Sequence, residues 1–518
     1  MFLKKIIKKT LKIILSFGFL ILFLLVVFSI DTFFEAKKTV YAGQKLFQEI
    51  INNQPKNFEK NFESWQKRFL SFKKRIFKID QLSGDFLDKK YKLRKFFDLV
   101  ENITFSIPDI VGENGQKIYF VLLQNDKELR PSGGFMGSYA KLKFKDGGLE
   151  DVTFQDIYVP DGQIVGHVDP PWPIQEAFKQ GWWRLRDANW DPDFPQAAKT
   201  IDWFFQKGKE EKADGIIAVN FSSVKKLLKI LGPIYLLDLN LTVDEENLYQ
   251  VAQSYSEVEF FPGSTQKKDV ISTLGKAFLE KAKSLNQKEI LPVIYQELEE
   301  RQILISFFEP SLAKIFSKLG WDGSMKYLAP STETLFNDYL YIVETNLGAN
   351  KANCCLKRRV DQEVDLTDGK FFKEHLKINF KNTGKYKEGI PPFFWGGTYV
   401  NFLRVYFPSF GSLEEIIIDH KKVGKEKMLF ETRENKNLKG IGFFVKVPAQ
   451  TETQVEVIYK IPSLTQLRNY HLIIQKQSGI ESFPYSLTLK TNYTRNFSKI
   501  EKKIRKDEEL FLVLYNEK

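Results

Sequence analysis

The stretch DGIIAVNFSSVKKLLKILGPIYLLDL, residues 214–239, decides the fold. Residues 214–221 are a short apolar run typical of a buried strand, and residues 222–232 repeat apolar side chains with helical spacing. Ser222 is expected to cap this helix and Gly232 to end it, and a further strand is predicted after it. An order of strand, helix and strand predicts an α/β layer around a central sheet.

The flanking sequence extends this domain in both directions. Residues 117–125 form a nearly continuous apolar run that predicts a buried strand, and the alternation around the Gly-Gly pair at 147–148 predicts a hairpin. A helix is predicted from Phe194, and most of 244–320 is predicted to be helical. We therefore expect an α/β domain with a helical segment over residues 106–357.

Helical periodicity disappears after about residue 358. Apolar residues then alternate with polar ones, as at Leu376, Ile378 and Phe380, between turns rich in Gly, Pro and Asn. Several short strands at such spacing predict an antiparallel β-sandwich. The polar stretch KRRVDQEVDLTDGK suits a domain edge, so this sandwich is predicted to span 358–518 and to fold independently.

A membrane anchor is predicted at the N-terminus. Leu11–Ile30 reads LKIILSFGFLILFLLVVFSI, which at about 1.5 Å per residue is long enough to cross a hydrocarbon core of about 30 Å. Five lysines precede most of this run, which predicts a cytoplasmic N-terminus and an extracytoplasmic body. A cleaved signal peptide is the alternative, but no small-x-small site directly follows Ile30. Residues 1–31 are thus interpreted as a cytoplasmic tail and a single-pass anchor in the lipid bilayer.

Residues 32–105 are predicted to form a helical stalk. Between Pro55 and Asp80, apolar and mostly aromatic residues recur at alternating steps of four and three, as in a helix that packs along its length. Ser83-Gly84 breaks this pattern, and a second helix is expected up to about Glu101. The aromatic stripe is expected to pack on the second helix; binding to the membrane surface is the alternative.

The composition excludes several classes of protein. A hydrophobic content of 43% excludes a disordered chain. The formal net charge is +12, but five lysines lie in the first dozen residues, so the body is only mildly basic and no nucleic-acid partner is expected. Two adjacent cysteines exclude a disulfide scaffold and a Cys-rich zinc site. The chain also lacks HExxH, GxSxG, GxxxxGK[ST] and the dinucleotide fingerprint.

The first candidate site is the glycine-rich segment from Gln124 to Ala140. Gly133 and Gly134 permit a tight backbone path, and Arg130 just before them can place a planar guanidinium against a phosphate or carboxylate. Backbone amides beside an arginine can hold an anion. The favoured alternative is a turn between strands, whose arginine pairs with Glu128 or a more distant acid.

The second candidate site is the segment WRLRDANWDPDFP, from Trp183 to Pro195. It places four oxygen-bearing side chains at every second position, which can turn several oxygens toward one hard cation: Asp187, Asn189, Asp191 and Asp193. The segment does not match a calcium-binding hand, because Pro192 stands where that loop needs Gly. The favoured alternative is structural: Asp193 caps a helix and Asp187 pairs with a nearby arginine, Arg184 or Arg186.

At these two segments the chain resembles the bacterial membrane-anchored proteins that carry the domain of unknown function 4012. The stretches that carry the resemblance are LLQNDKELRPSGGFMGSYA, RDANWDPDFPQAA, ADGIIAVN with LGPI, GWDG and ETNLGANKANCCLKRRV. The resemblance runs over about residues 115–480. Family members tend to have paired tyrosines where this chain has Cys354-Cys355, so we interpret these cysteines as small apolar replacements without a disulfide.

The resemblance implies an envelope protein with a structural or binding role, whose partner is an envelope polymer or protein. The stretch VNFSSVKKLLKILGPIYL is also similar to a segment of the LytR-CpsA-Psr family, which transfers polyprenyl-linked glycopolymers to the cell wall. That similarity implies an alternative: Arg130 would contact a lipid pyrophosphate, and Asp187, Asp191 and Asp193 would hold Mg²⁺. The arginine of that family's Ile-Pro-Arg-Asp stretch has no counterpart in Tyr158-Val159-Pro160-Asp161.

Overall fold

The computed structural model describes residues 32, 34–53, 57–82, 84–85, 93–237, 240–257, 266–284, 287–368, 370–385, 396–463, 467–492 and 498–514. These residues fall into two compact units. The first contains the described residues up to Lys117 together with Lys143–Asp151, and the second contains Ile118–Leu142 and Val152–Lys518. The predicted anchor Leu11–Ile30 lies outside the described residues. Within them, no helix is both long and apolar enough to span a bilayer.

The first unit is mainly helical. The chain is helical over 34–51, and its other helices are α2 (Phe58–Leu82), α4 (Leu93–Phe105) and α5 (Ile107–Ile110). The aromatic stripe of α2 packs as expected: Trp65 stacks on Phe69 with ring centroids 5.3 Å apart, and Phe69 contacts Phe97 of α4 at 6.0 Å. The helix over 34–51 also covers the stripe, because Leu46 packs in one cluster with Phe58.

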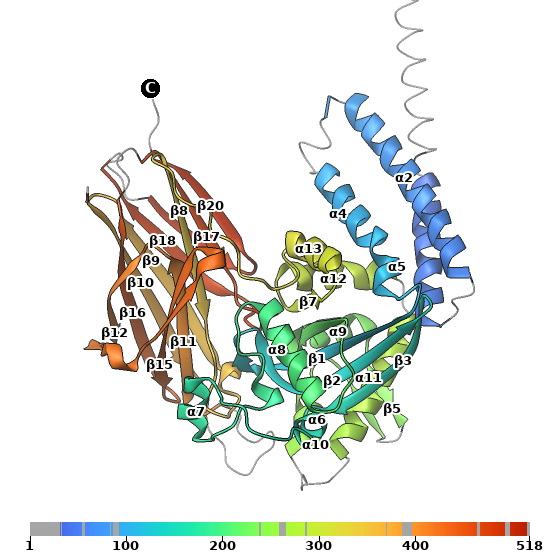
Figure 1. The fold of residues 1–518 in the computed structure, drawn as a ribbon, viewed down its shortest axis with the longest axis horizontal. Coiled ribbons are helices and arrows are strands. Elements are labelled where there is room, and N and C mark those ends of the chain that lie inside the picture. The colour runs from blue at the N-terminus through green and yellow to red at the C-terminus, as the bar shows by residue number, and fades with distance from the viewer. Residues whose placement is uncertain are drawn as a thin grey trace, which may run out of the picture. The chain divides into compact units, whose positions relative to one another are not determined.

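A five-stranded sheet organises the α/β part among the described residues, with strand order β3-β2-β1-β4-β7 (Figure 1). Its strands are β1 (Gln116–Arg130), β2 (Gly133–Lys145), β3 (Gly148–Asp156), β4 (Gly215–Asn220) and β7 (Ile303–Phe307). β1 and β4 run parallel, whereas β7 pairs antiparallel with β4. The predicted strands at 117–125 and 214–221 and the hairpin at 147–148 are therefore confirmed.

The same part of the chain contains helices, not all of which contact this sheet. They are α6 (Tyr158–Asp161), α7 (Trp172–Phe178), η2 (Leu185–Asp187), α8 (Phe194–Lys207), α9 (Phe221–Leu231), α10 (Leu248–Glu257), α11 (Gln266–Ser284), α12 (Gln287–Glu299) and α13 (Pro310–Leu319). Helix α8 covers the sheet with an apolar face, because Phe205 stacks on Phe120 of β1 at 4.1 Å. Both rings are fully buried, which stabilises the fold by roughly 2 kcal/mol for each ring.

Three local expectations differ from the structure. The N-cap position of α9 is Asn220, and Ser222 lies inside the helix, where its backbone N–H donates to Asp126. The strand predicted after Gly232 is β5 (Ile234–Leu236), which pairs with β6 (Leu241–Val243) in a separate small sheet. The region 244–320 is mostly helical as predicted, but it also contains β7, because a five-residue apolar run cannot be assigned to strand or helix by periodicity alone. Gly232 does end α9, with φ of 73°.

The C-terminal part is a sandwich of two sheets. Among the described residues, their strand orders are β13-β12-β16-β10-β9-β18-β19 and β14-β15-β11-β8-β17-β20. The strands are β8 (Leu335–Val343), β9 (Leu356–Asp365), β10 (Phe371–Asn382), β11 (Tyr399–Pro408), β12 (Ser412–Ile418), β13 (Lys421–Lys422), β14 (Leu429–Arg433), β15 (Leu438–Val447), β16 (Glu452–Pro462), β17 (Asn469–Gln475), β18 (Phe483–Lys490), β19 (Ser498–Ile504) and β20 (Glu508–Val513).

The sandwich differs from the expectation in two respects. Its pairing is mixed, because β8 runs parallel to β17 and β9 parallel to β18. It also begins before residue 358, since β8 lies between β11 and β17. The polar stretch expected to be a domain edge is largely strand β9, whose alternate side chains Val360 and Val364 are buried.

The sandwich core contains a buried acidic pair, Asp338 and Glu374. The Tyr470 hydroxyl donates to Asp338 at 2.5 Å, and the Tyr459 hydroxyl donates to Glu374 at 2.8 Å. Burial raises the pKa of Asp338 to about 6, although the hydrogen bond from Tyr470 opposes the shift. Burial, together with the neighbouring charge of Asp338, also raises the pKa of Glu374. At least one of the two carboxyl groups is therefore protonated at mildly acidic pH.

Cys354 and Cys355 are joined by a vicinal disulfide. The expectation of two unpaired apolar replacements is therefore wrong. Cys354 is the last residue of η4 (Ala352–Cys354), and Cys355 directly precedes β9.

Candidate functional site

Arg130 ends β1, and its guanidinium is fully engaged by the protein. Its Nε and Nη2 donate to Asp187 Oδ1 at 3.3 and 3.1 Å, and Nη2 also donates to Glu128 Oε1 at 3.1 Å. Its Nη1 donates to the backbone oxygen of Asn346 at 2.7 Å and more weakly to that of Leu129 at 3.4 Å. All five N–H groups of the guanidinium thus have acceptors. Arg130 joins β1 to η2 and to the segment after β8.

The electrostatics agree with a structural pairing. Arg130 is 2% exposed, and Asp187 is 4% exposed. Burial acts to lower the pKa of Arg130, but the charges of Glu128 and Asp187 outweigh it and raise the pKa above its ordinary value. The arrangement is the alternative that the sequence favoured, a turn whose arginine pairs with Glu128 and a more distant acid.

Gly133 and Gly134 allow two strands to approach closely. Gly133 has φ of 139°, and a Cβ atom there would lie 1.9 Å from Gln124 Oε1. A Cβ atom at Gly134 would lie 2.1 Å from the carbonyl carbon of Asn125. The Gly134 N–H donates to Asn220 Oδ1 at 3.2 Å, so this amide has a partner within the protein. Both positions require glycine for packing of β2 on β1.

The three candidate metal ligands have separate partners. Asp187 binds Arg130, whereas Asp191 Oδ2 accepts from Arg433 Nη1 at 2.9 Å. Asp193 Oδ2 lies 3.7 Å from Lys436 Nζ, and Asp193 Oδ1 is buried without a hydrogen-bond partner. Within the described part of the chain, no group of three or more His, Cys, Asp or Glu residues is placed to hold a metal. The expected helix cap is wrong in one respect: Asp193 occupies the N-cap position of α8, but its side chain makes no capping bond.

An ion pair that the sequence did not predict adjoins this region. Arg186 Nη1 donates to Asp161 Oδ2 at 2.7 Å, and Asp161 Oδ1 accepts from the backbone of Leu185 at the same distance. The guanidinium of Arg186 also lies 5.4 Å from the ring centre of Tyr158. Arg186 therefore contacts the stretch Tyr158-Val159-Pro160-Asp161, which contains no arginine of its own. Arg186 is in turn 3.8 Å from Asp187 Oδ2.

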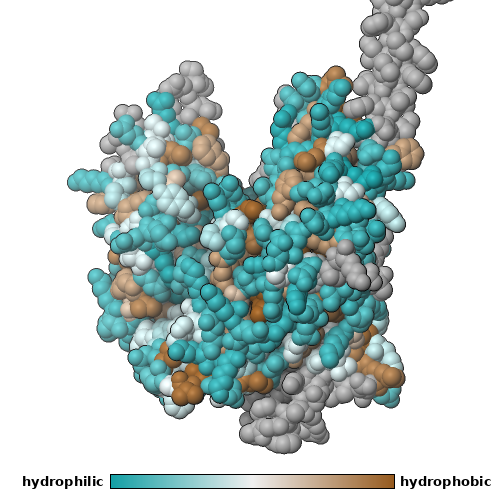
Figure 2. Space-filling model, turned by 45° about the vertical axis from the view of Figure 1, so that its right-hand side comes forward, coloured by the Kyte–Doolittle hydropathy of each residue, from teal (hydrophilic) through white to brown (hydrophobic). Residues whose placement is uncertain are grey.

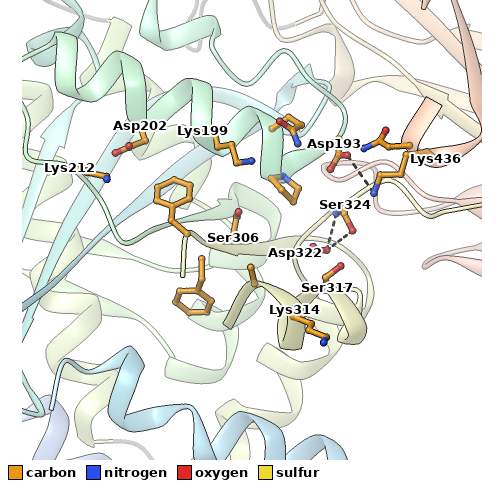
Figure 3. Close-up of a pocket in the computed structure, with 16 residues that line it drawn as sticks. Asp193, Lys199, Asp202, Lys212, Ser306, Lys314, Ser317, Asp322, Ser324 and Lys436 are labelled. Atoms are coloured by element: carbon orange, nitrogen blue, oxygen red, sulfur yellow. Dashed lines mark hydrogen bonds and ion pairs between the residues drawn. The ribbon is translucent and has the colours of Figure 1, made fainter. Parts of the chain in front are cut away.

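Asp193 also lines a pocket of about 620 Å³ (Figure 3). Its walls come from α8, the loop before β4, β7, α13 and the loop before β15. The charged residues that line it are Asp193, Lys199, Asp202, Lys212, Lys314, Asp322 and Lys436. Apart from Asp193, and Asp322 in the GWDG stretch, these residues belong to no motif of the sequence analysis, because they are isolated charges on separate elements.

Burial shapes the acids of this pocket. It raises the pKa of Asp193, although Lys436 opposes the shift, and it raises the pKa of Asp202, although the Ala213 N–H and Gln206 oppose it. Asp202 accepts from Ala213 at 2.9 Å and from Gln206 at 2.7 Å. Lys199 and Lys314 are exposed. Neither has an ion-pair or hydrogen-bond partner among the residues that the structure describes.

The fold and these sites define a protein with an α/β domain followed by a mixed β-sandwich. Residues 114–256, from just before β1 to α10, match the family model described as "Protein of unknown function (DUF4012)". The match contains three of the stretches that indicated this family, LLQNDKELRPSGGFMGSYA, RDANWDPDFPQAA and ADGIIAVN with LGPI, whereas GWDG and ETNLGANKANCCLKRRV lie outside it. No curated protein matches the sequence.

Several solved structures show weak similarity. Native yeast LTA4 hydrolase has a TM-score of 0.19 and 8% identity, and the alignment covers 29% of this chain and 27% of that one. A putative protease from Parabacteroides distasonis has a TM-score of 0.16 and 8% identity, and the alignment covers 26% of this chain and 29% of that one. An M1 zinc metallopeptidase from Deinococcus radiodurans has a TM-score of 0.13 and 4% identity, and the alignment covers 29% of this chain and 39% of that one. The chain thus spans well under half of each structure, and similarities this weak carry no argument about fold or activity.

Proposed function

We propose that the chain is a single-pass membrane protein whose extracytoplasmic body binds a component of the bacterial cell envelope. The anchor is supported by the apolar run Leu11–Ile30 and by the lysines that precede most of it. The resemblance of the motifs to bacterial membrane-anchored proteins is a second reason for this proposal.

The observation that carries a binding role is the pocket between α8 and α13. It offers exposed ammonium groups that the described protein does not pair, whereas the most conspicuous cation of the sequence, Arg130, is committed to Asp187, Glu128 and Asn346. The face drawn in Figure 2 is mainly hydrophilic, with hydrophobic side chains in small separate patches. These features favour a polar envelope partner.

The second candidate function is a LytR-CpsA-Psr-like transfer of polyprenyl-pyrophosphate-linked glycopolymers. The proximity of Arg130, Arg186 and Asp187 favours it, because two guanidinium groups near one carboxylate could bind a pyrophosphate if a bond to the protein were released. Asp187, Asp191 and Asp193 do not fit a shared Mg²⁺, since two of them bind different arginines and the third faces Lys436.

Surface proteolysis of intact cells tests the proposed location. With an epitope tag at each end, added protease should remove the C-terminal tag and leave a short N-terminal fragment in the membrane. A cytoplasmic protein in the same cells should stay intact and serves as the control for lysis. A full-length chain protected from protease would overturn the proposal.

A further inference from the structure

We propose that the pocket between α8 and α13 binds an anionic saccharide, that is, sugar units bearing phosphate or carboxylate groups. This inference rests on the proposed function and names the class of ligand. The pocket volume of about 620 Å³ is within the range of roughly 300–1,000 Å³ that is usual for small-molecule sites.

The formal charge of the pocket lining is slightly positive, with four lysines against three aspartates. Asp202 is held by Ala213 and Gln206, and Asp322 accepts from the backbone and hydroxyl of Ser324 at 3.0 and 2.8 Å. Figure 3 shows Lys199 on α8 and Lys314 on α13, on either side of the pocket. Because Lys199 and Lys314 have no ion-pair partner among the described residues, an anionic group that reaches either ammonium would gain a charge-assisted contact.

The remaining lining suits the rest of a sugar. The hydroxyls of Ser306 and Ser317 and the amides of Gln196 and Asn435 can exchange hydrogen bonds with sugar hydroxyls. The rings of Phe307 and Phe308 also line the pocket and provide apolar surface for a sugar ring. A few polar groups among aromatic surfaces are the usual composition of a site for a small polar ligand.

Asp193 supplies a separate indication of a ligand. Its side chain is 9% exposed, and its Oδ1 atom is buried without a hydrogen-bond partner, while Oδ2 is only loosely placed at 3.7 Å from Lys436. A buried acceptor without a hydrogen bond is unfavourable, so a ligand hydroxyl that donates to Oδ1 would supply the missing hydrogen bond. Asp193 Oδ1 can therefore accept a hydrogen bond from a ligand, in the same pocket as lysines that can bind its anionic group.

Binding measurements on the full-length chain in detergent micelles test this inference. The probes are glucose 6-phosphate, a galacturonate trisaccharide, neutral maltotriose and inorganic phosphate, each titrated by calorimetry. The two anionic saccharides should bind at least tenfold more tightly than maltotriose or phosphate, because only they engage both the lysines and the sugar-binding lining. Equal affinity for phosphate and glucose 6-phosphate would overturn the saccharide class.

Charge reversal localises the binding. The double variant Lys199→Glu with Lys314→Glu should lower the affinity for both anionic saccharides at least tenfold. The matched control is Lys318→Glu, which is exposed on α13 and outside the pocket. It should change the affinity less than twofold. If the double variant does not fold, Lys199→Gln with Lys314→Gln replaces it. Unchanged binding in a folded double variant would overturn the site. If surface protease cleaves the protein but no anionic saccharide binds, only this inference is overturned. If the anionic saccharides bind but surface protease leaves the chain intact, only the proposed location is overturned.

Discussion

Arg130 directs two N–H groups of its guanidinium at a single oxygen of Asp187, although the two residues are 57 positions apart in sequence. The contact joins the end of β1 to η2, and both side chains are nearly fully buried. Because removal of one member leaves the other as an unpaired buried charge, the pair is expected to be critical for folding even where its net contribution is small.

Arg130→Lys should therefore destabilise the protein by about 2 kcal/mol, since an ammonium group keeps the charge but cannot satisfy the same acceptors on Asp187, Glu128 and Asn346. Urea denaturation of the full-length chain measures the change. Arg505→Lys, at an exposed position, is the control and should change the free energy of unfolding by less than about 0.5 kcal/mol. If Arg130→Lys left stability unchanged but weakened a polyprenyl-pyrophosphate analogue tenfold, the transferase alternative would be favoured.

The sequence predicted those elements whose periodicity is visible within one segment. The β4 and α9 region and the β2–β3 hairpin follow from apolar runs, alternation and glycine positions. The parallel pairing of β8 with β17 could not be predicted, because alternation identifies the buried face of a strand but not its neighbour. The early start of the sandwich was also hidden, since β8 contains nearly continuous buried residues and shows no alternation.

The candidate site was predictable to a similar extent. The sequence indicated that Arg130 and Asp187 were special and that Arg130 pairs with an acid, but only the fold shows that Asp187 is its main partner. Lys199 and Lys314 belong to two helices that are brought to the same pocket by tertiary packing. Solvent-exposed lysines on amphipathic helices carry no signal of their own, so this pocket could not be predicted from a local motif.

The Asp338–Glu374 pair should make the protein less stable as the pH rises from about 4 to about 6. The pKa of Asp338 in the folded protein is raised to about 6 from an ordinary value near 3.8, so the folded state binds more protons in this interval. The stabilisation from the protonated carboxyl group is fully present below the pKa of the unfolded state, near 3.8, and is lost as the pH rises through the pKa of the folded state, about 6. The loss should be on the order of 3 kcal/mol, measured by urea denaturation at each pH.

Asp338→Asn tests the origin of that pH dependence. The amide cannot ionise, and its oxygen can still accept from the Tyr470 hydroxyl, so the fold should be retained. The variant should have a clearly smaller slope between pH 4 and 6. Glu426→Gln, an exposed change in the same part of the chain, should keep the slope of the unmodified protein. An unchanged slope in Asp338→Asn would assign the pH dependence to other groups.

Lys476 should produce a slope of opposite sign at higher pH. Burial, together with the charge of Arg301, lowers its pKa to about 7, despite the opposing charges of Asp507, Glu300 and Glu297. Between about pH 7 and 10 the folded state therefore binds fewer protons than the unfolded state, and stability should rise with pH. Lys476→Met should flatten this rise in urea denaturation, whereas Lys506→Met, at an exposed position, should not. A rise that persists in Lys476→Met would contradict the assignment.

The last prediction concerns the sandwich as a folding unit. A fragment of residues 365–518, which begins near the boundary expected from the sequence, lacks β8 and nearly all of β9. Each of these strands lies inside its sheet, β8 between β11 and β17 and β9 between β10 and β18, so their loss leaves two new unpaired edges in each sheet and an open core.

This fragment should accordingly remain unfolded, with no cooperative thermal transition in circular dichroism. A fragment of residues 332–518 restores both strands and with them Asp338, the partner of Tyr470, so it should be β-rich and melt cooperatively. Cooperative melting of the shorter fragment would show that β8 and β9 are dispensable. Failure of the longer fragment would show that the contacts of the sandwich with the α/β part, such as the hydrogen bond from Arg404 to the backbone of Trp190, are required for it to fold.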